Sequence, residues 1–440
     1  MCVSNKRSGL PRPGLKGAAF LQPVPGTGRR PLSFAPLFAL LFLSAGTIPV
    51  VNPASVLWTA PALLVAAMLI AWAAESAQFF IAQGFALAIL AWLQTLPEFA
   101  VEAVLAWKQQ VPLLMANLTG ALRLLTGLGW PMIYCTAALF HRARRKKPLG
   151  QVVLADEHCV EVVGLLAAMA YVVFVWWKAS LNILDAAVLI AIYTAYLVIL
   201  QRMPATEAEG IDDLETVPRA IVTARREIRA ATIILFFVGG GALIYYVAEP
   251  FLASLLAISA SLGIPYFIFV QWVAPFVSEF PEKVSAFYWA RTVERASVAL
   301  MNMVSSNINQ WTLLAAMLPI TYSISRGAPS AIPLDNRQQL ELLMTLGQSL
   351  LGAIFLVDMK LAWWEASGLF VLWGIQFAFS PIAPGAGVPG FLAEHIHEWV
   401  TAAYLLWAAV EIARLLAGRR RARAFGLFAV MWQRHLRPVR

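Results

Sequence analysis

The chain carries the same Pro-Glu pair in two long apolar segments, which read Thr95-Leu96-Pro97-Glu98-Phe99-Ala100-Val101-Glu102 and Glu279-Phe280-Pro281-Glu282-Lys283. Further along each copy, an Asn lies beside small residues, in Ala116-Asn117-Leu118-Thr119-Gly120 and in Met301-Asn302-Met303-Val304-Ser305-Ser306-Asn307. Because both elements recur in the same order, the sequence predicts two related halves, with Glu98 in the first and Glu282 in the second.

The composition indicates whether the protein folds in water or in a lipid bilayer. Of 440 residues, 60% are hydrophobic and 13% are charged, and the mean hydropathy is +0.71. A water-soluble core of this length cannot bury so much apolar surface. The sequence therefore predicts an all-α polytopic membrane protein, with the lipid bilayer as its main partner.

The net charge of +9 does not indicate nucleic-acid binding. Lys and Arg cluster between the apolar segments, as orientation in a membrane requires, rather than on a soluble aromatic-rich face. Cys2, Cys135 and Cys159 are scattered and have no metal-type spacing, so they predict neither a disulfide framework nor a zinc site.

Stretches of about 20 apolar residues, the length that crosses a bilayer as a helix, predict about twelve transmembrane helices. They are placed at 33–52, 57–74, 79–107, 112–139, 159–177, 181–200, 230–250, 264–290, 296–322, 338–357, 361–380 and 397–417.

The basic loops agree with this count. If the N-terminus is cytoplasmic, strict alternation places every basic cluster on the inner side, as the positive-inside rule requires. The clusters are Lys6, Arg7, Arg29 and Arg30; the run 141–147; Arg225, Arg226 and Arg229; Arg291 and Arg295; and the run 419–423. We expect an integral protein of a bacterial plasma (inner) membrane with both termini in the cytoplasm.

The predicted domain organisation follows from the longest polar insertion. Residues 201–229 form a cytoplasmic linker between a first repeat at 57–200 and a second at 230–380. Residues 1–32 form a disordered basic cytoplasmic arm, 33–52 an extra helix or a signal anchor, and 381–440 an extra C-terminal helix and basic tail. The run 394–398, Glu-His-Ile-His-Glu, contains residue types that bind metals. A solvated loop is favoured over a metal site, because no other His or Cys cluster accompanies the run.

Five helices in each half require the second half to enter the membrane from the opposite side, so the halves are predicted to be inverted repeats. A proline within a helix frees a backbone carbonyl on the preceding turn, and in lipid that oxygen needs a partner. A carboxylate beside each break, from Glu98 and Glu282, adds the oxygen ligands that hard cations such as Ca2+ and Na+ prefer.

These motifs resemble the calcium/cation antiporter superfamily of sodium/calcium exchangers. Its two repeats carry Ser-Leu-Pro-Glu on the second helix of each half, and Gly-Asn followed by Gly-Ser-Asn on the third. The resemblance implies that Glu98 and Glu282 bind the metal. It also implies that Gln94 and Glu279, which lie beside the helix breaks, can supply further oxygen ligands. It extends the candidate cation site to Thr95, Ser278, Asn117, Asn302, Ser305, Ser306 and Asn307.

The chain departs from the family pattern in its first half. The Gly-Ser-Asn position reads Gly120-Ala121-Leu122 and is followed by Arg123, while Leu125 stands where the second half has Gln310. The resemblance therefore implies an incomplete set of sodium ligands in the first half. Glu102, Glu279, Lys283 and Arg123 are predicted modulators, since an ionisable residue within a membrane is functional by default. Gln310 is a further predicted modulator, because it stands where the family has a polar ligand.

The leading hypothesis is an antiporter that moves Ca2+ or a related cation against Na+ or H+ by alternating access, with no cofactor beyond the transported ions. The alternative is a non-transporting protein of the same fold whose site is occupied by Lys283 or Arg123. An enzyme is not expected, because the apolar segments hold no nucleophile-base pair or metal triad. The transported and coupling ions, the direction and the oligomeric state are left open.

Overall fold

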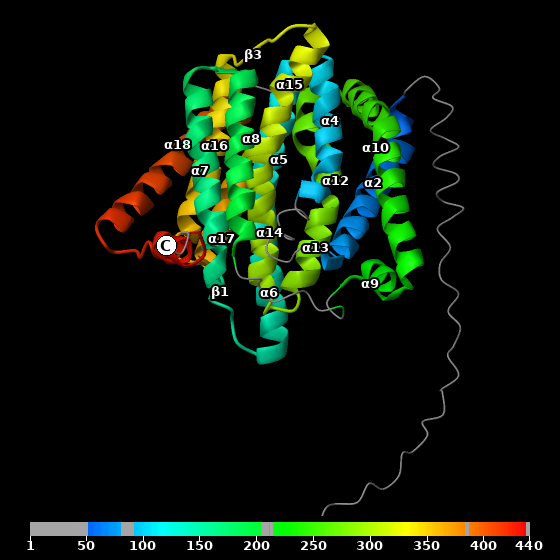
Figure 1. Ribbon diagram of the computed structural model, residues 1–440. Helices are drawn as coiled ribbons and strands as arrows, with labels where there is room; N and C mark the ends of the chain where they lie inside the picture. Colours follow the sequence, from blue (N-terminus) through cyan, green and yellow to red (C-terminus); the bar gives the residue numbers. More distant parts are fainter. Residues whose placement is uncertain (1–51, 81–91, 204–210, 212–213, 383–386, 437–440) are drawn as a thin grey trace, which may run out of the picture.

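The computed structural model describes residues 52–80, 92–203, 211, 214–382 and 387–436. Figure 1 shows a bundle of helices in which α2 and α10 lie side by side at one flank and α18 lies at the other. The predicted arm at 1–32 and most of the predicted helix at 33–52 lie outside the described residues.

The helices of the first half end before the linker. They are α2 (Val56–Ala77), α4 (Leu96–Trp107), α5 (Val111–Leu124), α6 (Trp130–Arg145), α7 (Cys159–Trp177) and α8 (Ile183–Gln201). The π-helical turn η4 (Leu125–Gly129) joins α5 to α6 without a break, so that 111–145 forms one span. That span is longer than the predicted 112–139.

The second half repeats this order. Its helices are α10 (Arg226–Leu262), α11 (Tyr266–Ile268), α12 (Ala274–Ser278), α13 (Phe280–Ala290), α14 (Ala296–Asn309), α15 (Ala315–Arg326), α16 (Asn336–Leu356) and α17 (Trp363–Phe379). The π-helical turns η7 (Phe269–Val273) and η8 (Gln310–Leu314) lie between α11 and α12 and between α14 and α15.

Several predicted boundaries are wrong. The linker contains the helix α9 (Thr216–Thr223), and α10 begins at Arg226, within the predicted linker. The last long helix, α18 (Val388–Leu416), begins before the run 394–398, which is therefore helical and not a loop. A second helix, α19 (Arg423–Met431), follows α18 in the predicted tail.

Seven helices in the described ranges are long and apolar enough to cross a membrane. The prediction of twelve spans is therefore not confirmed. The predicted span 264–290 is broken at Glu279, and the predicted span 79–107 has a turn at Thr95. The protein is helical and membrane-spanning, and the interruptions lie at the two Pro-Glu motifs.

Within the described ranges, four short strands link the halves. β1 (Gln151–Val153) pairs antiparallel with β4 (Lys360–Ala362), and β2 (Ser180–Leu181) pairs with β3 (Ile332–Pro333). Each pair joins a loop of one half to a loop of the other, so it satisfies backbone groups where the chain leaves the helices.

The basic loops gather at one end of the bundle. Arg144 donates a hydrogen bond to the Thr292 carbonyl oxygen at 3.4 Å, which joins the loop after α6 to the loop after α13. Arg423 forms an ion pair of 2.7 Å with Asp156, which lies just after β1. Figure 1 shows α9, the end of α6, β1 and the C-terminal segment at this same lower end.

Gly120 permits a close approach between the halves. A Cβ atom on Gly120 would lie 1.9 Å from the backbone carbonyl oxygen of Gln271. Only a glycine allows α5 to contact η7 in this way, since a methyl group would force two backbones apart. Small residues serve this purpose at many helix contacts in membranes.

We expect Gly120→Ala to destabilise the protein by about 1–3 kcal/mol through overpacking. Gly241→Ala is the matched control, because a Cβ there meets nothing within 4 Å, and alanine should even favour the helix slightly. Melting temperatures of the detergent-solubilised variants measure the difference. A Gly120→Ala protein as stable as the Gly241→Ala protein would contradict this packing.

Candidate functional site

The two Pro-Glu motifs each begin a helix in the middle of the bundle. Thr95 precedes α4 and Glu279 precedes α13, with Pro97 and Pro281 in the first turn, where a missing N–H costs nothing. The helix therefore restarts at each motif. Glu98 and Glu282 follow within the first turn, 1% and 0% exposed.

Polar side chains from the second half reach across to the first break. Gln310 donates from Nε2 to Glu98 Oε2 at 2.7 Å, and Asn302 donates from Nδ2 to Gln94 Oε1 at 3.2 Å. Asn309 donates from Nδ2 to Thr95 Oγ1 at 2.5 Å. These three hydrogen bonds bring the predicted residues Thr95, Glu98 and Asn302 together at the junction of the halves.

Gln310 also connects the two motifs. The same amide nitrogen lies 2.9 Å from Glu279 Oε1, while Lys283 binds Glu279 Oε2 at 2.7 Å. Gln310 therefore bridges Glu98 to the ion pair of Glu279 and Lys283. The π-helical turn η8 begins at Gln310, and such turns are frequent at functional sites.

The carboxylates at the junction outnumber the cations. Glu98 interacts electrostatically with Glu279, Glu102 and Glu282, and with Lys283 as the one cation among these partners. All five side chains are buried, with Lys283 the most exposed at 6%. Leaving such an excess of negative charge in a low-dielectric interior is strongly unfavourable unless protons or cations neutralise it.

Two hydrogen bonds between predicted site residues orient Glu282 and Glu102. Ser306 donates from Oγ to Glu282 Oε1 at 2.9 Å, and Asn117 donates from Nδ2 to Glu102 Oε1 at 3.2 Å. Each acid is thus oriented by the third helix of its own half.

Three predicted ligands bond elsewhere. Ser305 shares a hydrogen bond of 3.0 Å with the Tyr196 hydroxyl, and Asn307 donates to Thr126 Oγ1 at 2.8 Å. The Ser278 hydroxyl donates to the Ala274 carbonyl oxygen of its own helix at 3.1 Å. In this conformation their polar groups support the helices around the junction.

Many buried oxygens at the junction lack a hydrogen-bond partner among the described residues. They are Glu98 Oε1, Glu102 Oε2, Glu282 Oε2, Asn117 Oδ1, Asn302 Oδ1, Asn309 Oδ1 and Gln310 Oε1, and the amide nitrogen Gln94 Nε2 also lacks a partner there. An unsatisfied buried acceptor is costly, and a set made of oxygen acceptors is the set that a hard cation or a proton satisfies.

The carboxylates do not form a closed metal centre in this conformation. In the part of the chain that the structure describes, no three or more His, Cys, Asp or Glu side chains are gathered closely enough to hold a metal ion. The junction therefore offers Glu98 and Glu282 as separate acids, with amide and hydroxyl groups between them.

Arg123 belongs to a different network. Its guanidinium binds Glu341 Oε2 at 2.7 Å, donates from Nε to the Thr119 carbonyl oxygen at 3.0 Å and lies 5.3 Å from the ring centre of Trp272. Arg123 is fully buried and already paired. It does not occupy the junction as a tethered cation.

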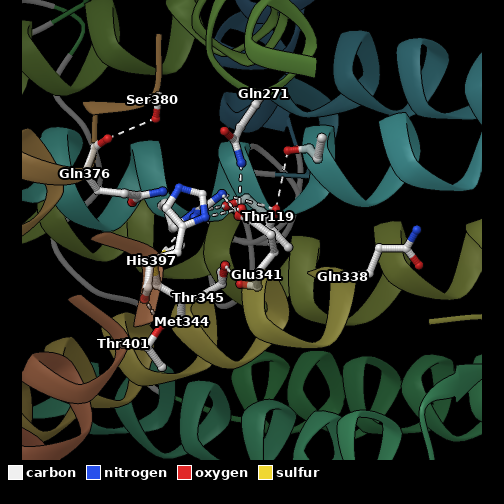
Figure 2. A network of polar contacts seen from close by, with 12 residues as sticks. Thr119, Gln271, Gln338, Glu341, Met344, Thr345, Gln376, Ser380, His397 and Thr401 are labelled. Carbon is white, nitrogen blue, oxygen red and sulfur yellow. Dashed lines mark hydrogen bonds and ion pairs between the residues drawn. The ribbon is translucent and has the colours of Figure 1, made fainter. Parts of the chain in front are cut away.

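His397 completes this second network. Its Nδ1 lies 2.8 Å from Glu341 Oε1, and Gln271 donates to Glu341 Oε2 at 3.0 Å. Figure 2 shows His397 and Gln271 pointing toward Glu341 from different elements, α18 and η7. Glu341 on α16 therefore connects α18 to α5 and η7 in the core.

Sequence reasoning missed several of these partners. Tyr196 and Thr126 lie in apolar segments and bond the predicted ligands Ser305 and Asn307. A polar group within a lipid-spanning segment was the available signal, because it must find a partner there. For His397, no local pattern indicates a partner that lies on another helix.

We expect Glu341→Gln to destabilise the protein by about 3–5 kcal/mol, because it leaves the Arg123 charge buried and unpaired. The double variant Arg123→Met/Glu341→Gln should recover part of this loss. Lys108→Met, which breaks an exposed pair with Glu249, is a control with little expected effect. Melting temperatures in detergent measure all three, and a double variant that is no more stable than Glu341→Gln would contradict the pairing.

Comparisons with known proteins agree with this architecture. The family model "Sodium/calcium exchanger protein" matches residues 51–201 and 232–380. A search of the curated proteins finds no match. The crystal structure of the H+/Ca2+ exchanger CAX is 31% identical, with a TM-score of 0.78, and the match covers 90% of this chain and 95% of that one.

Two other solved structures share the fold at lower identity. YfkE is 13% identical with a TM-score of 0.51, and the match covers 84% of this chain and 97% of that one. The sodium-calcium exchanger NCX_Mj is 16% identical with a TM-score of 0.50, over 75% of this chain and 99% of that one. With its two repeats both matched by the family model, the chain belongs to the sodium/calcium exchanger family, within the calcium/cation antiporter superfamily.

Proposed function

We propose that this protein is a cation antiporter that exchanges Ca2+ for H+ at the junction of its two halves. The observation that carries the proposal is the buried group of Glu98, Glu102, Glu279 and Glu282 around one ammonium, that of Lys283. Such a group must be neutralised, and it presents oxygens without partners in the described structure.

Ca2+ suits the ligand types at the junction. Apart from the amide nitrogen Gln94 Nε2, the unpartnered atoms at the junction are carboxylate and amide oxygens. Ca2+ takes six to eight oxygen ligands in a flexible geometry. The family of the chain and the H+/Ca2+ exchanger CAX, at 31% identity, support the same cargo. Glu98 and Glu282 would be the shared ligands, drawn together when the ion binds.

Protons are the coupling ion that the residues favour. Ala121, Leu122 and Leu125 provide no side-chain oxygen in the first half, so the pattern associated with sodium ligands is incomplete there. Buried carboxylates without a cation are neutralised most simply by protons, because a low-dielectric surrounding disfavours the charged form. A divalent cation entering the site would then release protons, and protonation would release the cation.

Alternating access would use the two halves as inverted repeats. Helices α4 and α13 contact α15 and α6 of the opposite halves, and the strand pairs also exchange partners between halves. This reciprocal pattern supports a pseudo-two-fold relation with the site at the repeat interface. The basic loops at one end would face the cytoplasm of a bacterial inner membrane.

The direct contacts do not favour the non-transporting alternative. Arg123 is paired with Glu341, and Lys283 is paired with Glu279 rather than with Glu98 or Glu282.

Uptake of radioactive calcium into proteoliposomes under an imposed pH gradient tests the proposal. We expect uptake in the wild type and a loss of at least about tenfold, equivalent to 1.4 kcal/mol or more, in Glu98→Gln and in Glu282→Gln. Each change removes one charge and keeps the side-chain shape, so the fold should persist.

Glu398→Gln is the matched control, because Glu398 is exposed on α18. It should transport like the wild type. A parallel batch with a sodium gradient and no pH gradient should show no uptake. Normal uptake in both junction variants would contradict the site, and uptake that follows sodium alone would contradict proton coupling.

A further inference from the structure

A basic pocket of about 560 Å3 lies at the end of the bundle where α18 stops and α19 begins. Its lining includes Lys360, Arg414, Arg419, Arg420, Arg421 and Arg423 against the acids Asp358 and Glu365. It lies far along the chain from the Pro-Glu motifs, and none of the junction residues lines it. We propose that this pocket binds the phosphate headgroup of an anionic lipid.

One arginine fixes the shape of the loop. Arg420 is 7% exposed in its side chain and binds Glu365 at 2.5 Å, Glu411 at 3.0 Å and the Phe355 carbonyl oxygen at 2.7 Å. Gly418 adopts a left-handed φ of +70° at the end of α18, which lets the chain turn. The loop is therefore held against the body before any ligand arrives.

Three other basic side chains of the pocket each form an ion pair with an acidic residue. Lys360 lies 3.8 Å from Asp358, Arg414 binds Glu411 at 2.8 Å, and Arg423 binds Asp156 at 2.7 Å.

Arg419 and Arg421 remain. Both are exposed, both line the pocket on either side of the buried Arg420, and neither forms an ion pair with any described residue. Two uncompensated guanidinium groups on a fixed loop match the charge and the acceptor oxygens of one phosphate.

The surroundings favour a lipid over a soluble phosphate. The helix α19 has no charged residue after Arg423, and Phe425 and Val430 are 47% and 42% exposed. Leu416 at the end of α18 is 84% exposed, and Trp363 at the start of α17 is 58% exposed. Exposed apolar and aromatic side chains beside basic ones are typical of the boundary between hydrocarbon and headgroups.

The geometry therefore places the guanidinium groups at headgroup level, with α19 along the acyl boundary. An anionic lipid there would join α17, α18 and α19, because its phosphate would contact the loop while its chains cover the exposed apolar residues. Attraction of this kind between basic residues and anionic lipids weakens with salt.

The test uses the full-length protein in a zwitterionic detergent. Its melting temperature is followed while short-chain phosphatidylglycerol, phosphatidylcholine of the same chain length, or inorganic phosphate is added. We expect a saturable rise with phosphatidylglycerol alone. In Arg419→Gln/Arg421→Gln the concentration for half the rise should increase on the order of tenfold or more.

Arg225→Gln/Arg226→Gln is the matched control, since it removes two adjacent exposed arginines at the start of α10. This control should respond like the wild type. An equal response of all three proteins to phosphatidylglycerol would overturn the site. A rise with inorganic phosphate that matches the rise with phosphatidylglycerol would overturn the assignment to a lipid.

Discussion

The electrostatic excess at the junction is the constraint on which the rest of the structure depends. Four buried carboxylates face one ammonium, and a membrane interior offers no solvent to screen them. Side-chain donors stabilise these carboxylates by hydrogen bonding to their oxygens. Gln310 is the clearest case, because its amide nitrogen donates to both Glu98 and Glu279. The unsatisfied oxygens that remain make the junction respond to protons and cations.

The two halves divide this task unequally. The third helix of the second half supplies Asn302, Asn309 and Gln310 to the break of the first half. The corresponding helix of the first half supplies Gly120, whose lack of a side chain lets α5 approach Gln271. The second half therefore provides hydrogen-bond donors to the first break, and the first half provides a small residue that lets the helices pack closely. The Arg123–Glu341–His397 network lies beside this contact and joins the C-terminal helix to it.

Much of this could be predicted from the sequence, because membrane spans are long and the Pro-Glu motif occurs twice. The family and the buried acids follow from the repeat, and the pairing of Glu279 with Lys283 follows from their i, i+4 spacing along one helix. Contacts between helices that are distant in the sequence cannot be predicted in this way. The partners of Arg123 and His397 depend on how α5, α16 and α18 pack, and Tyr196 is identified as the partner of Ser305 only once α8 lies against η8. The predicted start of the last long helix, at residue 397, is also wrong, because the polar His and Glu residues before it indicated a loop whereas α18 begins at Val388.

The most direct test of the account is the release of protons when Ca2+ binds to the purified protein in weakly buffered detergent, followed with a pH indicator. If the buried carboxylates exchange protons for the cation, adding Ca2+ should acidify the solution in a saturable way, and the combined change of Glu98→Gln and Glu282→Gln should remove the signal. Saturable Ca2+ binding by the wild-type protein without any proton release would contradict the account.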